Sequence, residues 1–287
     1  MKLLRFEDGK GARLGLLDGE VIVALDGLSD SYPTMLEIIR GGDDALAAIR
    51  TAAANDAERV PLANVRLLAP IERPGKYLAI GMNFSKHAAE AAALGVERPK
   101  QQFWFNKQTT CIAGPGDAID PGVSEKLDYE VELAVIIGKT AKGVSEEEAS
   151  SYVFGYTVAN DVSARDWQMH SPTFTIGKSF DTHGPIGPWI VTADEIGDPH
   201  SLRLQCRVNG ELRQDSDTSQ LIFNIWQQIS YLSTAFTLEP GDLLATGTPE
   251  GVGVAMQPPV FLQPGDVVRC EVEKVGVIEN TVSAPSR

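Results

Sequence analysis

Two glutamates separated by a single residue, Glu130 and Glu132, occur in a segment with strand composition, residues 128–138. Because side chains alternate along a strand, both carboxylates point to one face, which Ala134 and Ile136 continue with apolar side chains. Buried like charges raise the pKa of one carboxyl group or need a cation between them. An all-oxygen set selects a hard divalent ion such as Mg²⁺, Mn²⁺ or Ca²⁺. Acids with this spacing are also common on solvated strand faces, so that interpretation stays open.

A second predicted strand, Tyr152–Asp161, ends in an Asn-Asp pair. Asp161 at this strand end could supply a third oxygen ligand, although Asn-Asp is also a turn signal. The residues that follow are expected to form a helical turn. Arg165 and Gln168, three residues apart, then lie on one side of it.

A candidate general base lies on a predicted helix over residues 85–95, with Ser85 as its N-cap and Gly95 as its stop. His87 and Glu90 are three residues apart on this helix and can meet. A carboxylate beside an imidazole orients the ring and raises its basicity, as a general base requires. A pair on the solvated surface is the other interpretation.

Two later loops offer groups for an anionic ligand. Lys178 lies among glycines and prolines in residues 175–189, where a lysine can meet an anionic substrate or simply face solvent. Residues 245–253 follow a predicted strand, and their hydroxyls and backbone N–H groups could hold a carboxylate. No helix is predicted after them and the glycine spacing is wrong, which argues against a dinucleotide-binding loop.

The composition of the 287 residues excludes several classes of protein. There are 25 Lys and Arg against 39 Asp and Glu, a net charge of −14, which disfavours binding to nucleic acid or to anionic lipid. No apolar run reaches the roughly 20 residues that span a bilayer. The N-terminus lacks the features of a signal peptide. The three cysteines form no CxxC pair, which fits a reducing cytoplasm and disfavours a zinc-thiolate site.

The elements that must position these residues suggest two parts. Residues 1–70 predict a small α/β unit with strands at 13–17 and 21–25 and helices at 33–39 and 44–54. From residue 71 to 287, short β segments alternate with Gly- and Pro-rich turns, and an amphipathic helix is predicted over 219–236. Strands do not alternate regularly with helices, so we expect a mixed α+β, mostly β fold rather than a doubly wound sheet.

Taken in order, these segments resemble the fumarylacetoacetate hydrolase family. The resemblance covers about residues 70–280. In length and motifs, the chain is similar to the bacterial two-domain branch of the family, in particular to 2,4-diketo-3-deoxy-sugar-acid hydrolases. The chain departs from that subgroup between Gln168 and Thr175, and Phe103-Trp-Phe-Asn is also unusual. The motifs that carry the resemblance are Gly81-Met-Asn-Phe with His87-x-x-Glu90, Gly114-Pro-Gly-Asp117, Asp128-Tyr-Glu-Val-Glu132, Asn160-Asp-Val-Ser-Ala-Arg-Asp166, Gly177-Lys-Ser-Phe-Asp181 and Thr246-Gly-Thr-Pro249.

The resemblance implies a β-roll catalytic domain at residues 71–287, a small N-terminal domain at 1–70, and a homodimer. It implies Mg²⁺ or Mn²⁺ as cofactor, with Ca²⁺ as a substitute. By matching position, the implied metal ligands are Glu130, Glu132 and Asp161; the catalytic residues are His87, Glu90 and Lys178; and the substrate contacts are Arg165, Gln168, Thr248 and Lys107. The roles of His170, His183 and Phe103–Phe105 stay open.

The expected activity is metal-dependent hydrolysis of a C–C bond in a 2,4-diketo acid, either acylpyruvate-like or a 2,4-diketo-3-deoxy sugar acid. The products would be pyruvate, or a similar acid, and a second carboxylic acid. His87, oriented by Glu90, would activate the attacking water, and Lys178 would stabilise the developing oxyanion. A decarboxylase of oxaloacetate-like acids or an isomerase, each passing through an enolate at the ion, is the first alternative. A non-catalytic protein that binds a metal and a small ligand is the second.

Overall fold

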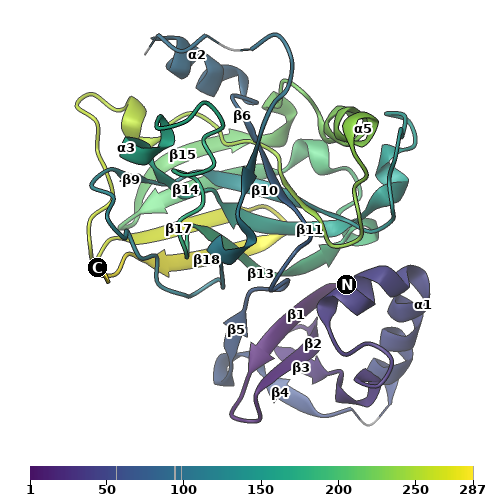
Figure 1. Ribbon diagram of the computed structural model, residues 1–287. Coiled ribbons are helices and arrows are strands. Elements are labelled where there is room, and N and C mark those ends of the chain that lie inside the picture. Colours follow the sequence, from purple (N-terminus) through teal and green to yellow (C-terminus); the bar gives the residue numbers. More distant parts are fainter. Residues whose placement is uncertain (56, 94, 98, 287) are drawn as a thin grey trace.

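The computed structural model describes residues 1–55, 57–93, 95–97 and 99–286. Within them, most strands join one large mixed sheet, and the others form a four-stranded antiparallel sheet and a two-stranded ladder. Figure 1 shows a small N-terminal unit beside a larger body that contains the remaining strands. No helix in the described part of the chain combines the length and the apolar character needed to cross a bilayer.

The N-terminal unit is a twisted antiparallel sheet with a long helix. Its strands run in the order β4-β3-β2-β1, and β5 pairs with the second half of β1. A left-handed Gly42, at φ 51°, interrupts the helix, in agreement with the two predicted helices. The helix begins only at Met35, because the Thr34 side chain accepts the backbone N–H of Glu37. The elements are β1 (Lys2–Glu7), β2 (Ala12–Asp18), β3 (Val21–Ala24), α1 (Met35–Ala54), β4 (Arg59–Pro61) and β5 (Arg66–Leu68).

The large sheet continues from the N-terminal unit into the main body. Its order is β1-β13-β11-β10-β16-β6-β7, with β8 beside β13; the β16–β6 and β13–β8 pairs are parallel, and the other pairs among the described strands are antiparallel. Leu3 of β1 faces Ile190 of β13 across this junction. The strands are β6 (Tyr77–Gly81), β7 (Phe103–Lys107), β8 (Ile112–Ala113), β10 (Val131–Ile137), β11 (Val153–Asn160), β13 (Gly184–Thr192) and β16 (Leu243–Ala245).

The second sheet packs on β10 and β11 and encloses the main core. Its order is β15-β14-β17-β18. Odd-numbered residues of β10, including Leu133 and Val135, point into this core, whereas Ala134 and Ile136 join the cluster on the opposite face. The remaining elements are β9 (Leu127–Asp128), paired with β12 (Ser163–Ala164), then β14 (Arg203–Val208), β15 (Glu211–Asp217), β17 (Val267–Val272), β18 (Gly276–Thr281), α2 (Ser85–Ala93), α3 (Arg165–Gln168), α4 (Ala193–Ile196) and α5 (Ile225–Ala235).

Two predicted boundaries are wrong for local reasons. The amphipathic helix expected over 219–236 starts at Ile225, because Asn224 and Gln227 form a reciprocal capping box there. Within the strand-like segment 128–138, β10 starts only at Val131, because the backbone N–H of Tyr129 turns to the Asp128 carboxylate. The face shared by Glu132, Ala134 and Ile136 is nevertheless the one expected.

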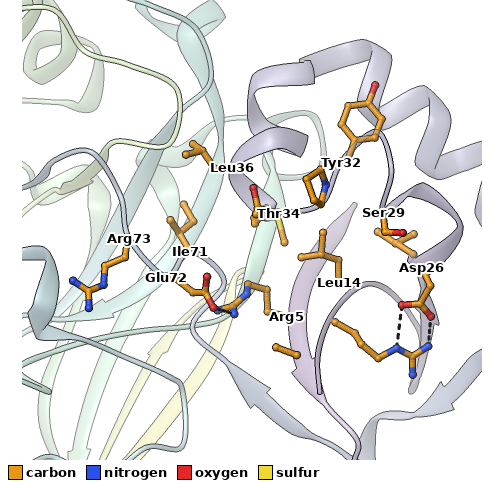
Figure 2. Close-up of a pocket in the computed structure, with 15 residues that line it drawn as sticks. Arg5, Leu14, Asp26, Ser29, Tyr32, Thr34, Leu36, Ile71, Glu72 and Arg73 are labelled. Carbon is orange, nitrogen blue, oxygen red and sulfur yellow. Dashed lines mark hydrogen bonds and ion pairs between the residues drawn. The ribbon is translucent and has the colours of Figure 1, made fainter. Parts of the chain in front are cut away.

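A cavity of about 400 Å³ lies between the N-terminal unit and the chain leading into the main body (Figure 2). Its charged groups are largely paired already. Arg13 contacts Asp8, Asp26 and Glu58, and Arg5 contacts Glu72. Because those guanidinium groups are neutralised, we assign no chemistry to this cavity.

Candidate active site

Three carboxylates meet where β10 begins and β11 ends. Glu132 lies on β10, Glu130 directly precedes it, and Asp161 directly follows β11. The antiparallel pairing sets Val131 opposite Asn160, and the N–H of Asp161 donates to the carbonyl of Glu130 at 2.9 Å. One oxygen from each carboxylate lies within 4.8 Å of the others, and all three residues are buried. The predicted trio is therefore brought together in one site.

Basic side chains surround this trio. Lys178 Nζ lies 2.8 Å from Glu130 Oε2 and 2.7 Å from Asp161 Oδ2. The Arg165 guanidinium lies 2.7 Å from Glu130 Oε1 and 2.8 Å from Asp128 Oδ2. Burial favours neutral Glu130, but the charges of Lys178 and Arg165 outweigh it and lower the pKa of Glu130 to about 2.

Glu132 is the exception in this network. Its Oε2 accepts the backbone N–H of Gly247 at 2.8 Å, and it has no ion pair within the described residues. Burial raises the pKa of Glu132 well above its usual range, and the nearby charges of Asp161 and Glu130 raise it further. Such a carboxyl group must hold a proton or share a cation with its neighbours. The donor set thus fits a hard divalent ion bound by Glu130, Glu132 and Asp161.

The predicted contact between His87, the candidate general base, and Glu90 is also formed. On α2, His87 Nδ1 lies 3.1 Å from Glu90 Oε2, and the other oxygen of Glu90 accepts the N–H of Gly251 at 3.0 Å. Because a carboxylate only accepts, Nδ1 of a neutral His87 carries the proton and Nε2 is left as the basic nitrogen. His87 is largely buried, which argues against the solvated pair considered from the sequence.

A compact cavity of about 60 Å³ reaches His87, Glu130 and Lys178, whereas Glu90, Glu132 and Asp161 do not line it. Polar and charged side chains cover one part of its wall, and apolar ones cover the other. The polar residues are His87, Glu130, Arg165, Gln168, Lys178 and Thr248, and the apolar ones are Ile80, Met82, Phe105 and Phe174, together with Gly81. The site therefore suits a small anion with a short apolar portion.

The remaining predicted substrate contacts differ from one another. Arg165 donates to Gln168 Oε1 at 3.1 Å, so the two share one side of α3, as expected. The Thr248 hydroxyl donates to the carbonyl of Val131 at 3.0 Å. For Lys107, the substrate contact that the resemblance implied stays a prediction. Its amine is buried 2.5 Å from Asp161 Oδ1 and is not part of the cavity wall.

Sequence reasoning missed several residues that hold the site in place. The Asp128 carboxylate accepts hydrogen bonds from the Arg165 side chain and from the backbone N–H groups of Gly253 and Val254. Asn83, two residues before α2, donates side-chain hydrogen bonds to the carbonyls of Thr246 and Phe223. These bonds connect distant parts of the chain, and only the presence of both residues within recognised motifs marked them.

The structure also places the residues whose roles the sequence left open. His183 is buried away from the cavity, with Nε2 2.9 Å from the carbonyl of Asp120. His170 is exposed and packs on Trp167 at 4.9 Å between ring centroids. Phe105 lines the cavity, and Phe103 packs behind it against Phe174.

Both parts of the chain match known protein families. Residues 76–283 match the family described as fumarylacetoacetate (FAA) hydrolase C-terminal, and residues 1–70 match the N-terminal family described as Rv2993c-like. Oxaloacetate tautomerase fahd2, mitochondrial, of Xenopus laevis is 45% identical, over 98% of this chain and 90% of its own. The human oxaloacetate tautomerase FAHD2A, mitochondrial, is 42% identical, over 98% of this chain and 91% of its own.

Solved structures share the whole fold. The fumarylacetoacetate hydrolase of Exiguobacterium antarcticum has a TM-score of 0.85 and 37% identity, covering 99% of both chains. Maleylpyruvate hydrolase of Sphingobium sp. SYK-6, in complex with manganese(II) ion and pyruvate, has a TM-score of 0.84 and 33% identity, covering 100% of both chains. The mostly β fold with a small N-terminal unit is thus confirmed, and the chain belongs to the fumarylacetoacetate hydrolase family.

Proposed function

We propose that this chain catalyses keto–enol tautomerisation of a compact 2-oxo dicarboxylate, with oxaloacetate as the substrate to test first. The observation that carries the proposal is the His87–Glu90 pair at the edge of a cavity of only about 60 Å³. Since roughly 10–15 Å³ of such space holds one water molecule, there is room for a small keto acid and little more. The names of the tautomerase relatives support the same substrate.

The proposed reaction moves one proton between carbon and oxygen. His87 Nε2 takes a proton from C3 of the keto form, and the C–H electrons form the C2–C3 double bond. The oxygen on C2 gains the charge, and the imidazolium then gives it the proton, so atoms and charge balance. Glu90 keeps the ring oriented and stabilises its charged form.

Lys178 is suited to stabilise the charge that develops on oxygen. An ammonium group has three N–H donors, and Lys178 uses two of them on Glu130 and Asp161. Burial favours the neutral amine, but the charges of Asp161 and Glu130 outweigh it and raise the pKa of Lys178, so the side chain stays protonated. The third N–H is left for the substrate oxygen.

We further propose that Glu130, Glu132 and Asp161 hold Mg²⁺ or Mn²⁺, with Ca²⁺ as a substitute. When bound, the ion supplies Lewis-acid stabilisation of negative charge on the 2-oxo acid group. The like charges around Glu132 support this, because they leave that carboxylate in need of a cation. The complex of maleylpyruvate hydrolase with manganese(II) ion and pyruvate also supports it.

Hydrolysis of a C–C bond in a short 2,4-diketo acid is the second candidate. The observation that favours it is the basic Nε2 of His87, which could deprotonate a water molecule as well as a carbon acid. The relatives named as hydrolases support it. It needs room for both an acyl group and a water molecule, and the small cavity therefore ranks it below tautomerisation.

One assay separates these activities. Oxaloacetic acid is dissolved in its enol form, and the decay of the enol absorbance is followed while pyruvate is measured in the same sample. Faster decay that needs the ion and His87, without pyruvate, supports the tautomerase. Ion-dependent pyruvate and CO₂ would indicate a decarboxylase instead. Pyruvate released from acetylpyruvate, with no effect on the oxaloacetate enol, would indicate the hydrolase.

The proposal keeps the expectation of a homodimer that works in the cytoplasm on a small-molecule substrate. Light scattering on the purified chain tests the dimer directly. A mass close to one chain at micromolar concentration would rule it out.

A further inference from the structure

One aromatic side chain closes the apolar part of the cavity. Phe174 packs edge-on against Phe103 and Phe105, with ring centroids 5.1 and 6.2 Å apart. Phe105 in turn lies beneath the Lys178 amine, 5.1 Å from its ring centroid. Phe103 and Phe105 alternate along β7, whereas Phe174 belongs to the loop between α3 and Lys178. Phe105 and Phe174 therefore form a wall beside the group proposed to meet the substrate oxygen, and Phe103 supports Phe174.

The loop holds Phe174 in a conformation that a bulky residue seldom adopts. Its φ is 60°, in the left-handed region that Cβ disfavours, and Met82 on the same cavity has φ 55°. Such strain persists only where the surroundings fix it, and it clusters at functional sites. A phenylalanine at a position that would suit glycine suggests that the ring itself matters.

Backbone contacts fix the loop at its end. The carbonyl of Phe174 accepts the N–H of Lys178 at 3.2 Å, and the carbonyl of Gly177 accepts the N–H of Ala164 at 2.8 Å. A Cβ on Gly177 would lie 2.4 Å from the backbone of Gln168, so only glycine permits this close approach. The backbone that carries the ring is thus tied to both Lys178 and the α3 turn.

We propose that Phe174, supported by Phe103 and Phe105, limits the size of the group attached beyond C3 of the substrate. This inference rests on the proposed function, because it assumes that a 2-oxo acid binds in this cavity with its oxo group toward Lys178. It restricts the substrates to compact acids and excludes diketo acids with an aromatic or long acyl group. Phe174 is then a specificity-determining residue.

The test is ligand binding, which does not depend on turnover. Dissociation constants for acetylpyruvate and benzoylpyruvate are measured by calorimetry on the Mn²⁺-loaded chain. The variants are Phe174→Ala, Phe174→Leu and, as a control, Phe236→Ala, whose side chain is 38% exposed and does not line the cavity. Phe174→Leu keeps an apolar side chain in the wall and serves if the alanine variant does not fold.

We expect the wild type to prefer acetylpyruvate by at least about tenfold, as pockets of this kind discriminate by size. Phe174→Ala should reduce that preference by about tenfold through tighter benzoylpyruvate binding, Phe174→Leu by less, and Phe236→Ala not at all. Equal binding of the two acids by the wild type, no binding of acetylpyruvate, or unchanged preference in both Phe174 variants would overturn the proposal. If the preference shifts as expected but oxaloacetate is not tautomerised, the proposed reaction fails and the size limit stands.

Discussion

Protonation of His183 should control how stability falls in mild acid. The ring is buried and stacked on Phe180, 5.1 Å between centroids, and Nε2 lies 2.9 Å from the Asp120 carbonyl. Because a carbonyl only accepts, Nε2 carries the proton of the neutral ring. Nδ1 is buried without a hydrogen-bond partner in the described structure. A second proton there would be both charged and unsatisfied, and burial lowers the pKa of His183 from 6.5 to about 4.

The sign and size of the effect follow from this shift. A histidine whose folded pKa is depressed stabilises the fold above pH 6.5, and that contribution is lost as the pH falls toward 4. The full difference corresponds to about 3 kcal/mol, of which about 2 kcal/mol is lost by pH 5. The Glu130 carboxylate, whose pKa is lowered to about 2, acts mainly at lower pH.

The assay compares the wild type with His183→Gln, whose amide can replace the donor at Nε2. Urea denaturation in EDTA at pH 7.5 and pH 5.0 gives the free energy of unfolding without any contribution from bound metal. The wild type should lose about 2 kcal/mol more than the variant between these pH values. Groups that titrate equally in both proteins, including Glu132, cancel in this comparison. Equal losses in the two proteins would refute the assignment of the neutral buried ring.

Three further predictions concern single residues around the carboxylates. Glu132→Gln relieves the repulsion among buried acids, so the melting temperature of this variant in EDTA should not fall. Its Mn²⁺ affinity, measured by calorimetry, should drop by at least about 100-fold. Unchanged affinity would exclude Glu132 as a ligand. Lys107→Met leaves Asp161 with one buried partner fewer and should cost about 3 kcal/mol in urea denaturation. A cost under about 1 kcal/mol would show that the buried pair contributes little. Gly247→Ala sets a Cβ 2.8 Å from Asn83 Cβ at a φ of +109°. It should lower the free energy of unfolding by about 2 kcal/mol and weaken Mn²⁺ binding. A variant with unchanged stability and Mn²⁺ affinity would show that the loop adapts freely.

The site could be predicted from the sequence where local geometry decides it. The spacing of Glu130 and Glu132 predicted that they meet, although Glu130 lies just before β10, and helical spacing brought His87 to Glu90. The partners of these groups could not be read in the same way. The N–H of Gly247 reaches Glu132 across 115 positions of the chain, a contact that depends on β16 lying beside β10.

Lys107 illustrates the same difficulty. Its place in the family pattern suggested a substrate contact, whereas its ion pair with Asp161, 54 positions away, depends on how β7 and the end of β11 lie in the fold. The loop that carries Phe174 is a further case, because its position depends on the close approach of Gly177 to Gln168. In the N-terminal unit, local signals predicted β2, β3 and the break in α1 at Gly42, but not β1, which pairs with the distant β13.

The most direct test of the account is proton exchange at C3 of oxaloacetate. The substrate is placed in D₂O with Mg²⁺, and NMR follows the loss of its C3 protons and the appearance of pyruvate beyond an enzyme-free control, with wild type and with His87→Ala. We predict exchange above the uncatalysed rate without pyruvate, and a decrease of about 10²- to 10⁴-fold in the variant. Exchange that persists unchanged in His87→Ala, or wild-type protein that forms pyruvate without accelerating exchange, would contradict the central claim.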